Sequence, residues 1–218
     1  MKKQMVTIMI LLGMASILMS QNLLVNGDFS DGLDGWAHNP TMDGGVEGVI
    51  EVYEDELVPA AGDGPYLGMF CEGDTYFNQC IWQPVTVNVG DTLVADGAFK
   101  DMTAGGLMNY WCELYLGLSE PVENVDYTSH RWLAFNWWDG CANNIDGTFL
   151  EDACVRTDTS KSYWVVPDSL GSGEVTIYFM IKTGIWTDGS DGVLMYEVGI
   201  DSLTLTRKGS TTAVEDRI

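Results

Sequence analysis

The stretch Asn22–Trp36, "NLLVNGDFSDGLDGW", is crowded with turn-forming residues. A short apolar run is followed by an Asn-Gly pair, two Asp-Gly pairs and a tryptophan. Gly, Asn and Asp accept turn conformations at little cost, so apolar runs that they bound are typical of strands. The stretch predicts a first β-strand, a compact turn region, and a Trp36 side chain that closes one end of a core.

Residues 1–20 have the layout of a secretory signal peptide. Lys2 and Lys3 give a basic start, the run Met5–Met19 is almost wholly apolar, and Ser20 is a small residue before the expected cut. The apolar run is shorter than the ~20 residues that a membrane-spanning helix needs. We therefore expect cleavage after Ser20, a secreted or cell-surface protein, and no membrane span.

The charge of the chain excludes one class of partner. The sequence carries 10 basic and 32 acidic residues, a net charge of -22, and removal of Lys2 and Lys3 leaves about -24 by the same count. Such a surface repels phosphate, so nucleic acid is not an expected partner. Many of the aspartates stand next to glycine in turns, where they can bind calcium or simply be solvated.

Five cysteines lie in the part expected to be exported, where disulfides persist. Sequence proximity suggests the pairs Cys71–Cys80 and Cys141–Cys154, with Cys112 left over. A thiolate metal site is not expected, because no two cysteines are spaced as C-x-x-C.

The remainder of the chain alternates strand-like and turn-like segments, and no helical periodicity extends beyond about two turns. Residues 21–207 therefore predict an all-β domain, an antiparallel β-sandwich of the jelly-roll type. The expected strands are 46–53, 65–71, 76–88, 92–100, 109–117, 131–138, 162–166, 174–182 and 193–206.

Three segments together resemble one group of proteins. They are "NLLVNGDFSDGLDGW", "IWQPVTVNVGDTLVADG" (81–97) and "YEVGIDSLTLT" (196–206). In this order they are similar to the opening, central and closing motifs of carbohydrate-binding module families 4, 9 and 22. The resemblance covers nearly the whole of 22–206. It implies a β-sandwich that binds a polysaccharide or oligosaccharide and holds a structural calcium ion.

The same resemblance implies where that calcium lies. The family positions correspond here to Asp28 and Gly64, each through a backbone carbonyl, and to the carboxylate of Asp201. Oxygen ligands of this kind suit calcium. Ser30 and Ser202 stand where the family often has acidic residues, so the site depends mainly on Asp201.

Sugar-binding modules of this group use a sheet face on which aromatic rings stack on sugars and polar groups bond the hydroxyls. In 109–117, strand alternation separates Trp111, Glu113 and Tyr115 from an apolar face. The same alternation in 174–182 and 131–138 exposes Tyr178 and Trp132 and buries Trp137. The expected ligand-binding residues are Trp111, Glu113, Tyr115, Trp132, Trp138, Tyr178 and Trp186.

Two other functions remain open at the level of sequence. A jelly-roll glycosidase or lyase would use Glu113 as an acid, or the pair Glu54 and Glu56, which share a strand face. Basic groups for a lyase are limited near the proposed face to Arg131 and Lys182. The third possibility is a calcium-stiffened adhesion domain without affinity for sugars.

The tail 208–218 is polar and has no strand pattern, so we interpret it as a linker. Its segment "GSTTAVEDRI" is similar to segments that precede C-terminal sorting domains of type 9 secreted bacterial proteins. This similarity predicts a bacterial protein with a sorting or catalytic domain beyond residue 218.

Overall fold

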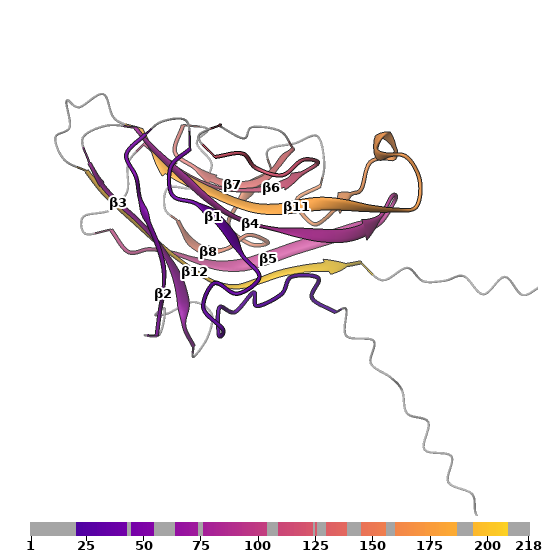
Figure 1. Ribbon diagram of the computed structural model, residues 1–218, viewed down its shortest axis with the longest axis horizontal. Helices are drawn as coiled ribbons and strands as arrows, with labels where there is room; N and C mark the ends of the chain where they lie inside the picture. Colours follow the sequence, from indigo (N-terminus) through magenta and orange to yellow (C-terminus); the bar gives the residue numbers. More distant parts are fainter. Residues whose placement is uncertain are drawn as a thin grey trace, which may run out of the picture.

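Two antiparallel β-sheets pack face to face in the computed structural model (Figure 1). Within the described residues, no helix is long and apolar enough to cross a membrane. The predicted signal peptide 1–20, the tail from 209 onward, Glu56 and Cys141 lie outside those residues. The structure describes residues 21–42, 45–54, 64–73, 76–103, 109–123, 125, 130–138, 145–155, 160–186 and 194–208.

Sheet A forms one layer of the sandwich, and all its strand pairs are antiparallel. Its long strands β4 and β11 pair over twelve residues, and β6 continues the sheet on the other side of β11. In spatial order the strands are β1 (Ala37–Asn39), β4 (Phe77–Asn88), β11 (Glu174–Ile185), β6 (Tyr110–Gly117), β7 (Arg131–Asn136) and β9 (Cys154–Val155).

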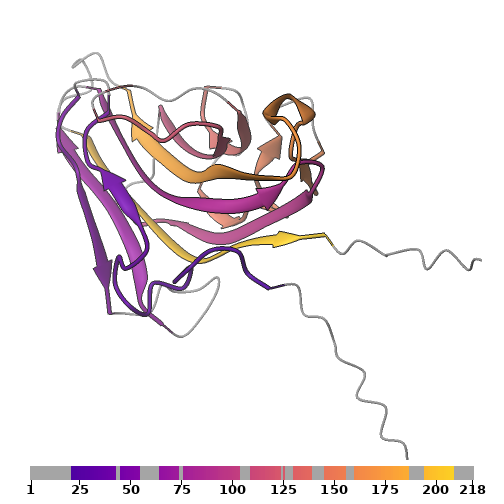
Figure 2. The ribbon, with the colours of Figure 1, turned by 45° about the vertical axis from the view of Figure 1, so that its right-hand side comes forward.

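Sheet B forms the second layer, seen below sheet A in Figure 1 and from the side in Figure 2. A short 3-10 helix, η1 (Asp168–Leu170), precedes β11. The order of the sheet is β10 (Trp164–Val165), β5 (Thr92–Asp101), β12 (Leu194–Arg207), β3 (Tyr66–Gly73) and β2 (Val49–Tyr53), and β8 (Asp146–Thr148) also pairs with β5. The predicted all-β antiparallel sandwich is confirmed.

The core lies between the sheets and follows the expected alternation. In β11 the side chains of Ile177, Phe179 and Ile181 are buried in the core. The intervening residues of β11 lie on the outward side of sheet A, which we call the outer face of sheet A. Apolar area removed from water contributes roughly 25 cal/mol per Å², so this continuous core is the main stabilising feature.

The opening stretch is built around two asparagines, and its first part differs from the prediction. Residues 23–26 form bends, and no residue of the stretch 22–26 belongs to a strand. Asn22 accounts for the difference, because its side chain accepts hydrogen bonds from the backbone of Leu24 and Leu205 and donates one to the carbonyl of Leu203. These side-chain bonds interrupt a ladder with β12, of which the backbone bonds Leu23–Leu205 and Gly27–Leu203 remain.

Asn26 organises the turns that follow. Its backbone has φ of 51°, a left-handed conformation that asparagine tolerates. The amide bonds the backbone of Gly32, Asp34 and Asp31, and the Asn26 carbonyl accepts a hydrogen bond from the Trp36 indole at 2.9 Å. Trp36 is buried in the core, as predicted.

The predicted cysteine pairs are only partly supported. Cys71, Cys80 and Cys112 are buried thiols, so the Cys71–Cys80 disulfide prediction is wrong. Cys71 lies in sheet B and Cys80 in sheet A, so nearness in sequence does not make them partners. Cys154 is disulfide-bonded.

Candidate functional site

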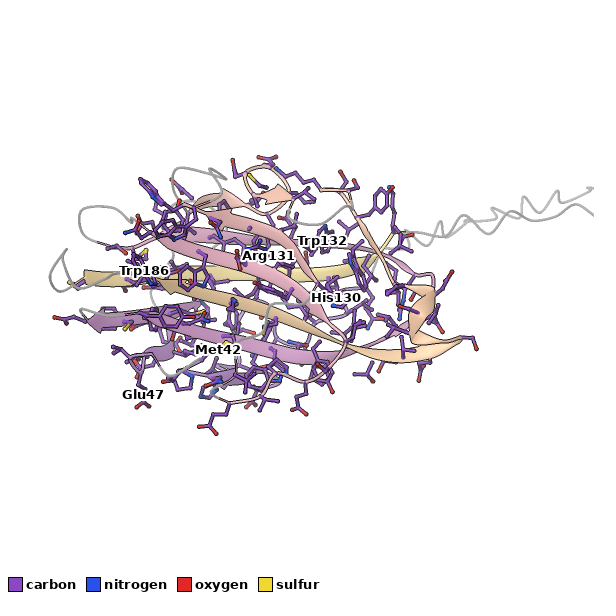
Figure 3. All side chains as sticks on the ribbon, turned by 90° about the horizontal axis from the view of Figure 1, so that it is seen from above. Met42, Glu47, His130, Arg131, Trp132 and Trp186 are labelled. Carbon is purple, nitrogen blue, oxygen red and sulfur yellow. The ribbon has the colours of Figure 1, made fainter. Side chains whose placement is uncertain are left out.

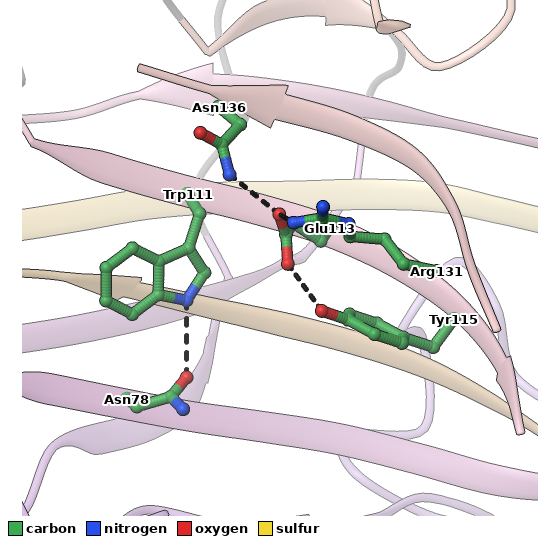
Figure 4. A network of polar contacts seen from close by, with 6 residues as sticks. All are labelled: Asn78, Trp111, Glu113, Tyr115, Arg131 and Asn136. Atoms are coloured by element: carbon green, nitrogen blue, oxygen red, sulfur yellow. Dashed lines mark hydrogen bonds and ion pairs between the residues drawn. The ribbon is translucent and has the colours of Figure 1, made fainter. Parts of the chain in front are cut away.

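Trp111 lies across the outer face of sheet A. Gly184 of β11 pairs with Trp111 in register, and a Cβ at Gly184 would overlap the indole ring. The glycine therefore leaves room for the ring above the backbone of β11. On the far side of β11 the indole N–H donates to Oδ1 of Asn78 in β4 at 3.3 Å (Figure 4). Trp111 thus spans three neighbouring strands and remains half-buried.

Three further aromatic residues lie at the same end of sheet A, and with Trp111 we call them the aromatic rim: Tyr76, Trp111, Trp138 and Trp186. The rings of Tyr76 and Trp111 are 5.8 Å apart, and those of Trp138 and Trp186 are also 5.8 Å apart in an edge-to-face arrangement. Trp138 and Trp186 are 56% and 42% exposed. Figure 3 shows Trp186 at one end of this face, away from His130 and Arg131.

Strand register explains why the rim forms. Ile185, near the end of β11, pairs with Phe77 of β4 and with Tyr110 of β6, and Trp111 pairs with Asn136 of β7. The four adjacent strands β4, β11, β6 and β7 therefore begin or end at the same end of sheet A. Their flanking residues come together there although they are far apart in sequence.

A buried ionic network continues from the rim along the outer face. Glu113 is 2% exposed, and its Oε1 accepts hydrogen bonds from Arg131 at 2.6 Å and from Asn136 at 2.7 Å. Its Oε2 accepts the hydroxyl of Tyr115 at 2.6 Å (Figure 4). Three donors thus stabilise a carboxylate that burial would otherwise destabilise strongly.

This arrangement determines what Glu113 can do chemically. A carboxylate that holds an arginine, an amide and a phenol in place acts as an anchor for the neighbouring side chains. A glycosidase also needs a second carboxylate on the other side of the scissile bond. The described part of sheet A shows no such partner for Glu113, since Glu54 lies beyond β2 in sheet B.

The middle of the outer face is more closed than predicted. Tyr115 is 2% exposed, so a ligand does not reach its ring in this structure. Tyr178 is partly buried beside it. Lys182 is 5% exposed, and its ammonium lies 5.1 Å from the Tyr115 ring centre. Met42, from the segment after β1, is fully buried in the same cluster.

Trp132 was predicted to face a ligand, and this placement is wrong. A β-bulge sets Arg131 opposite Tyr115, while Leu133 pairs with Leu114, so Trp132 is an extra residue between them. Its side chain turns into the core, is 0% exposed, and donates its indole N–H to the Ser160 carbonyl at 3.0 Å.

Trp137, expected in the core, is 41% exposed instead. It lies just beyond the end of β7, where its backbone N–H bonds the Tyr110 carbonyl. Its ring contacts that of Tyr110 with centres 6.2 Å apart. The strand ends before this position, so strand alternation no longer determines its burial.

The residues expected to hold calcium lie at the other sheet. Asp201 of β12 is 3% exposed, and the described residues supply it with no ion pair; only Ser202 hydrogen-bonds it. Burial raises the pKa of Asp201, and the nearby negative charge of Asp28 adds to this effect. A buried carboxylate without a cationic partner is the kind of group that a bound cation stabilises.

The residues that follow Asp201 border a hollow of about 370 Å³. Its lining consists of Asn22, Leu24, Asn26, Gly27, Asp28 and residues 202–204, and it does not include Asp201 or Gly64. Ser30 donates to Oδ1 of Asp28 through its backbone N–H and its hydroxyl. Gly64 lies two residues before β3, whose Leu67 pairs with Ile200 beside Asp201. The described residues include no cluster of three or more His, Cys, Asp and Glu side chains arranged for a metal.

Two of the buried thiols, Cys71 and Cys112, are not candidates for nucleophilic chemistry. Burial raises the pKa of Cys71 to about 11, and it raises that of Cys112 further. A thiol with so high a pKa carries almost no thiolate near neutral pH.

Comparison with known proteins gives similarities of fold. No protein-family model and no curated protein sequence matches the chain. Similar solved structures include TmCBM61 in complex with beta-1,4-galactotriose, 14% identical, with 87% of this chain and 100% of that chain covered and a TM-score of 0.45. Another is the CBM22-2 xylan-binding domain of Paenibacillus barcinonensis Xyn10C. It is 14% identical, with 84% of this chain and 98% of that chain covered and a TM-score of 0.46.

A third similar structure is the enzymatically active domain of bacteriophage CBA120 tailspike protein 4. It is 10% identical, with 86% of this chain and 21% of that chain covered and a TM-score of 0.50. The likeness is one of fold. It concerns the β-sandwich architecture, and the ligand must be argued from the residues of the site.

Two parts of the site could not be found from the sequence. Asn78 and Tyr76 were not predicted, although Asn78 accepts the Trp111 indole N–H and donates to the Tyr76 hydroxyl at 2.9 Å. The importance of Gly184 was also missed. A glycine in an otherwise β-branched or apolar strand is a signal of close approach, but its partner depends on register.

Proposed function

We propose that this protein is a secreted, non-catalytic domain that binds a neutral polysaccharide chain at the aromatic rim. The observation that carries the proposal is the Trp111 indole lying over Gly184. A ring held against the backbone in this way can present its other face to a sugar. Flat apolar surfaces with polar groups between them are what pyranose rings require.

The polar groups beside the rim hold its side chains in place. Asn78 and Asn136 lie on either side of Trp111 in the sheet, are 0% and 5% exposed, and bond Trp111 and Glu113 through their amides. Arg131 is partly exposed and already ion-paired with Glu113. Together with the strong negative charge of the chain, this favours a neutral glycan over an acidic one.

Affinity gel electrophoresis against soluble glucans, xylan, galactan and mannan tests the proposal. We expect retardation by at least one polysaccharide, and we expect Trp138→Ala and Trp186→Ala each to weaken it by about 5- to 20-fold, equivalent to about 1–2 kcal/mol. Tyr163→Ala is the matched control, because Tyr163 is 37% exposed but lies outside the rim. A folded protein that no polysaccharide retards would contradict the proposal.

We also propose that calcium stabilises the sandwich, with the Asp201 carboxylate and the carbonyls of Asp28 and Gly64 as its ligands. The cation would supply positive charge at a buried carboxylate and tie the opening stretch to β12. The proposal is supported by the burial of Asp201, which has no cationic partner among the described residues, and by the hollow that residues 202–204 share with the opening stretch.

A further inference from the structure

A second hollow opens at the opposite edge of sheet A from β7, where β1 lies beside β4. Its volume is about 420 Å³, within the range of small-ligand pockets. The chain that follows β6 closes its other side. The hollow is lined by His38, Asn39, Pro40, Trp82, Pro121 and Glu123.

Asn39 supplies an unused hydrogen-bond donor. The side chain is 3% exposed, and its Nδ2 is fully buried and has no hydrogen-bond partner among the described residues. The amide orientation is fixed, because Oδ1 accepts the backbone N–H of Thr41 at 3.1 Å. A buried donor without a partner is costly and uncommon in folded proteins, so a small shift of the Asn39 side chain that brought Nδ2 to the wall of the hollow would let a ligand acceptor relieve the cost.

The other lining groups complement that donor. Trp82 contributes an apolar wall and packs behind the hollow against Tyr115 and Met180. Glu123 and His38 are exposed, and they offer a carboxylate acceptor and an imidazole. The carboxylate disfavours anions, whereas a ring with neighbouring hydroxyls can accept from Asn39, donate to Glu123 and pack against Trp82.

We propose that this hollow is a separate saccharide site that takes one neutral sugar ring, such as the end of a glycan chain. The inference rests on the proposed function for the class of ligand and adds a second location. Trp82 stands four residues along β4 from Asn78, which bonds Trp111 of the rim, and it pairs with Ala37 of the edge strand β1. The two sites can therefore be tested independently.

The experiment uses the whole mature domain labelled with 15N at the tryptophan indoles. Methyl β-glycosides of glucose, galactose, mannose and xylose are the probes, and Trp82→Phe assigns the Trp82 signal. We expect at least one glycoside to shift the Trp82 signal in a saturable way. Asn39→Asp keeps the acceptor for Thr41 but removes the donor, and we expect it to weaken binding at least 10-fold.

Two further variants protect the test against misfolding. Glu123→Gln changes an exposed residue of the lining and should weaken binding about 3-fold or more, whereas Glu120→Gln, exposed on the same segment but outside the lining, should leave it unchanged. Saturable shifts only at Trp138 and Trp186 would overturn this proposal and leave the proposed function standing. Polysaccharide retardation with an unmoved Trp82 signal for every glycoside would do the same.

Discussion

Gly27 connects the opening stretch to β12. Its carbonyl accepts the backbone N–H of Leu203 at 2.8 Å, and its Cα lies against the Leu203 carbonyl. The backbone here is ordinary for any residue, so the need for glycine is purely steric. Asn22 holds the same carbonyl through its side-chain amide, which leaves the two segments little freedom to separate.

A methyl group at Gly27 should therefore lower the free energy of unfolding. In Gly27→Ala the new Cβ would overlap the Leu203 carbonyl oxygen, and we expect a loss of about 2–4 kcal/mol in the free energy of unfolding. Urea denaturation measures it. Gly64→Ala, where a Cβ meets no atom within 4 Å, is the control. Both variants are measured with chelator, because the Gly64 carbonyl is a proposed calcium ligand, and the control should then change stability by less than ~0.5 kcal/mol. Equal losses in both variants would refute the steric explanation.

Replacing Glu113 tests whether the ionic network is structural. In Glu113→Gln the amide cannot accept all three donors, so we expect a loss of about 1–3 kcal/mol in stability. Tyr115→Phe removes a single donor and should cost about 1 kcal/mol. If Glu113→Gln leaves stability unchanged but abolishes release of reducing ends from a polysaccharide, the residue is an acid catalyst and the structural assignment is wrong.

At this scale, sequence reasoning succeeded where the cause is local. The Asn-Gly and Asp-Gly turns and the buried Trp36 follow from residue types within fifteen positions. Trp132 failed because a single inserted residue reversed its direction. A bulge of this kind depends on the register of β6, which no local pattern reveals.

An ion pair joins the neighbouring strands β5 and β12 of sheet B. At the end of β12, Arg207 donates to Asp91 at 2.7 Å, in the turn before β5. Burial acts to raise the pKa of Asp91, but the backbone N–H of Asn88 and the Arg207 guanidinium outweigh it and hold the pKa below its ordinary value. The folded state therefore favours the ionised carboxylate.

This lowered pKa predicts a dependence of stability on pH. The contribution of Asp91 is present above the unfolded pKa of about 4 and is lost as the pH falls through the lower folded pKa. We expect Asp91→Asn to reduce stability at pH 7 and to lessen the decline between about pH 4 and pH 2. Urea midpoints across that range measure it, with exposed Asp34→Asn as the control. An unchanged acid decline would exclude this role for Asp91.

The long strands could be predicted to within a few residues because each has its own apolar alternation and flanking turns. The short strands β1, β8 and β9 were not predicted. Two or three residues cannot show a period, and these strands exist only because a neighbour offers free backbone groups. For the same reason the aromatic rim was predicted in part: Trp111, Trp138 and Trp186 were expected, but their gathering at one edge depends on four strand registers.

Calcium is predicted to act on the stability of the whole domain. A ligand that binds only the folded state at about 100 times its Kd adds about 2.7 kcal/mol, which for a domain of this size raises the Tm by roughly 5–10 °C. Scanning calorimetry with calcium and with chelator measures this rise. We expect Asp201→Asn to abolish it.

Asp28→Asn is the matched control for the calcium experiment, because the proposed ligand at that position is the backbone carbonyl. It should retain most of the rise in Tm. An identical Tm of the unaltered protein with calcium and with chelator would contradict the calcium proposal, and it would leave the sugar-binding proposal unaffected.

The antiparallel contact between the opening stretch and β12 has a mechanical consequence. Leu23 bonds Leu205, and Gly27 bonds Leu203, so the start of the opening stretch and the end of β12 lie at the same end of this contact. Figure 2 shows the two segments leaving the domain on the same side. A pull that separates those two ends loads the bonds one after another, as in a zipper, and not all together as in shear. The domain should therefore resist little force when it is stretched between its N-terminal and C-terminal ends. A force applied between one end and a bound glycan would not act across the contact between the opening stretch and β12.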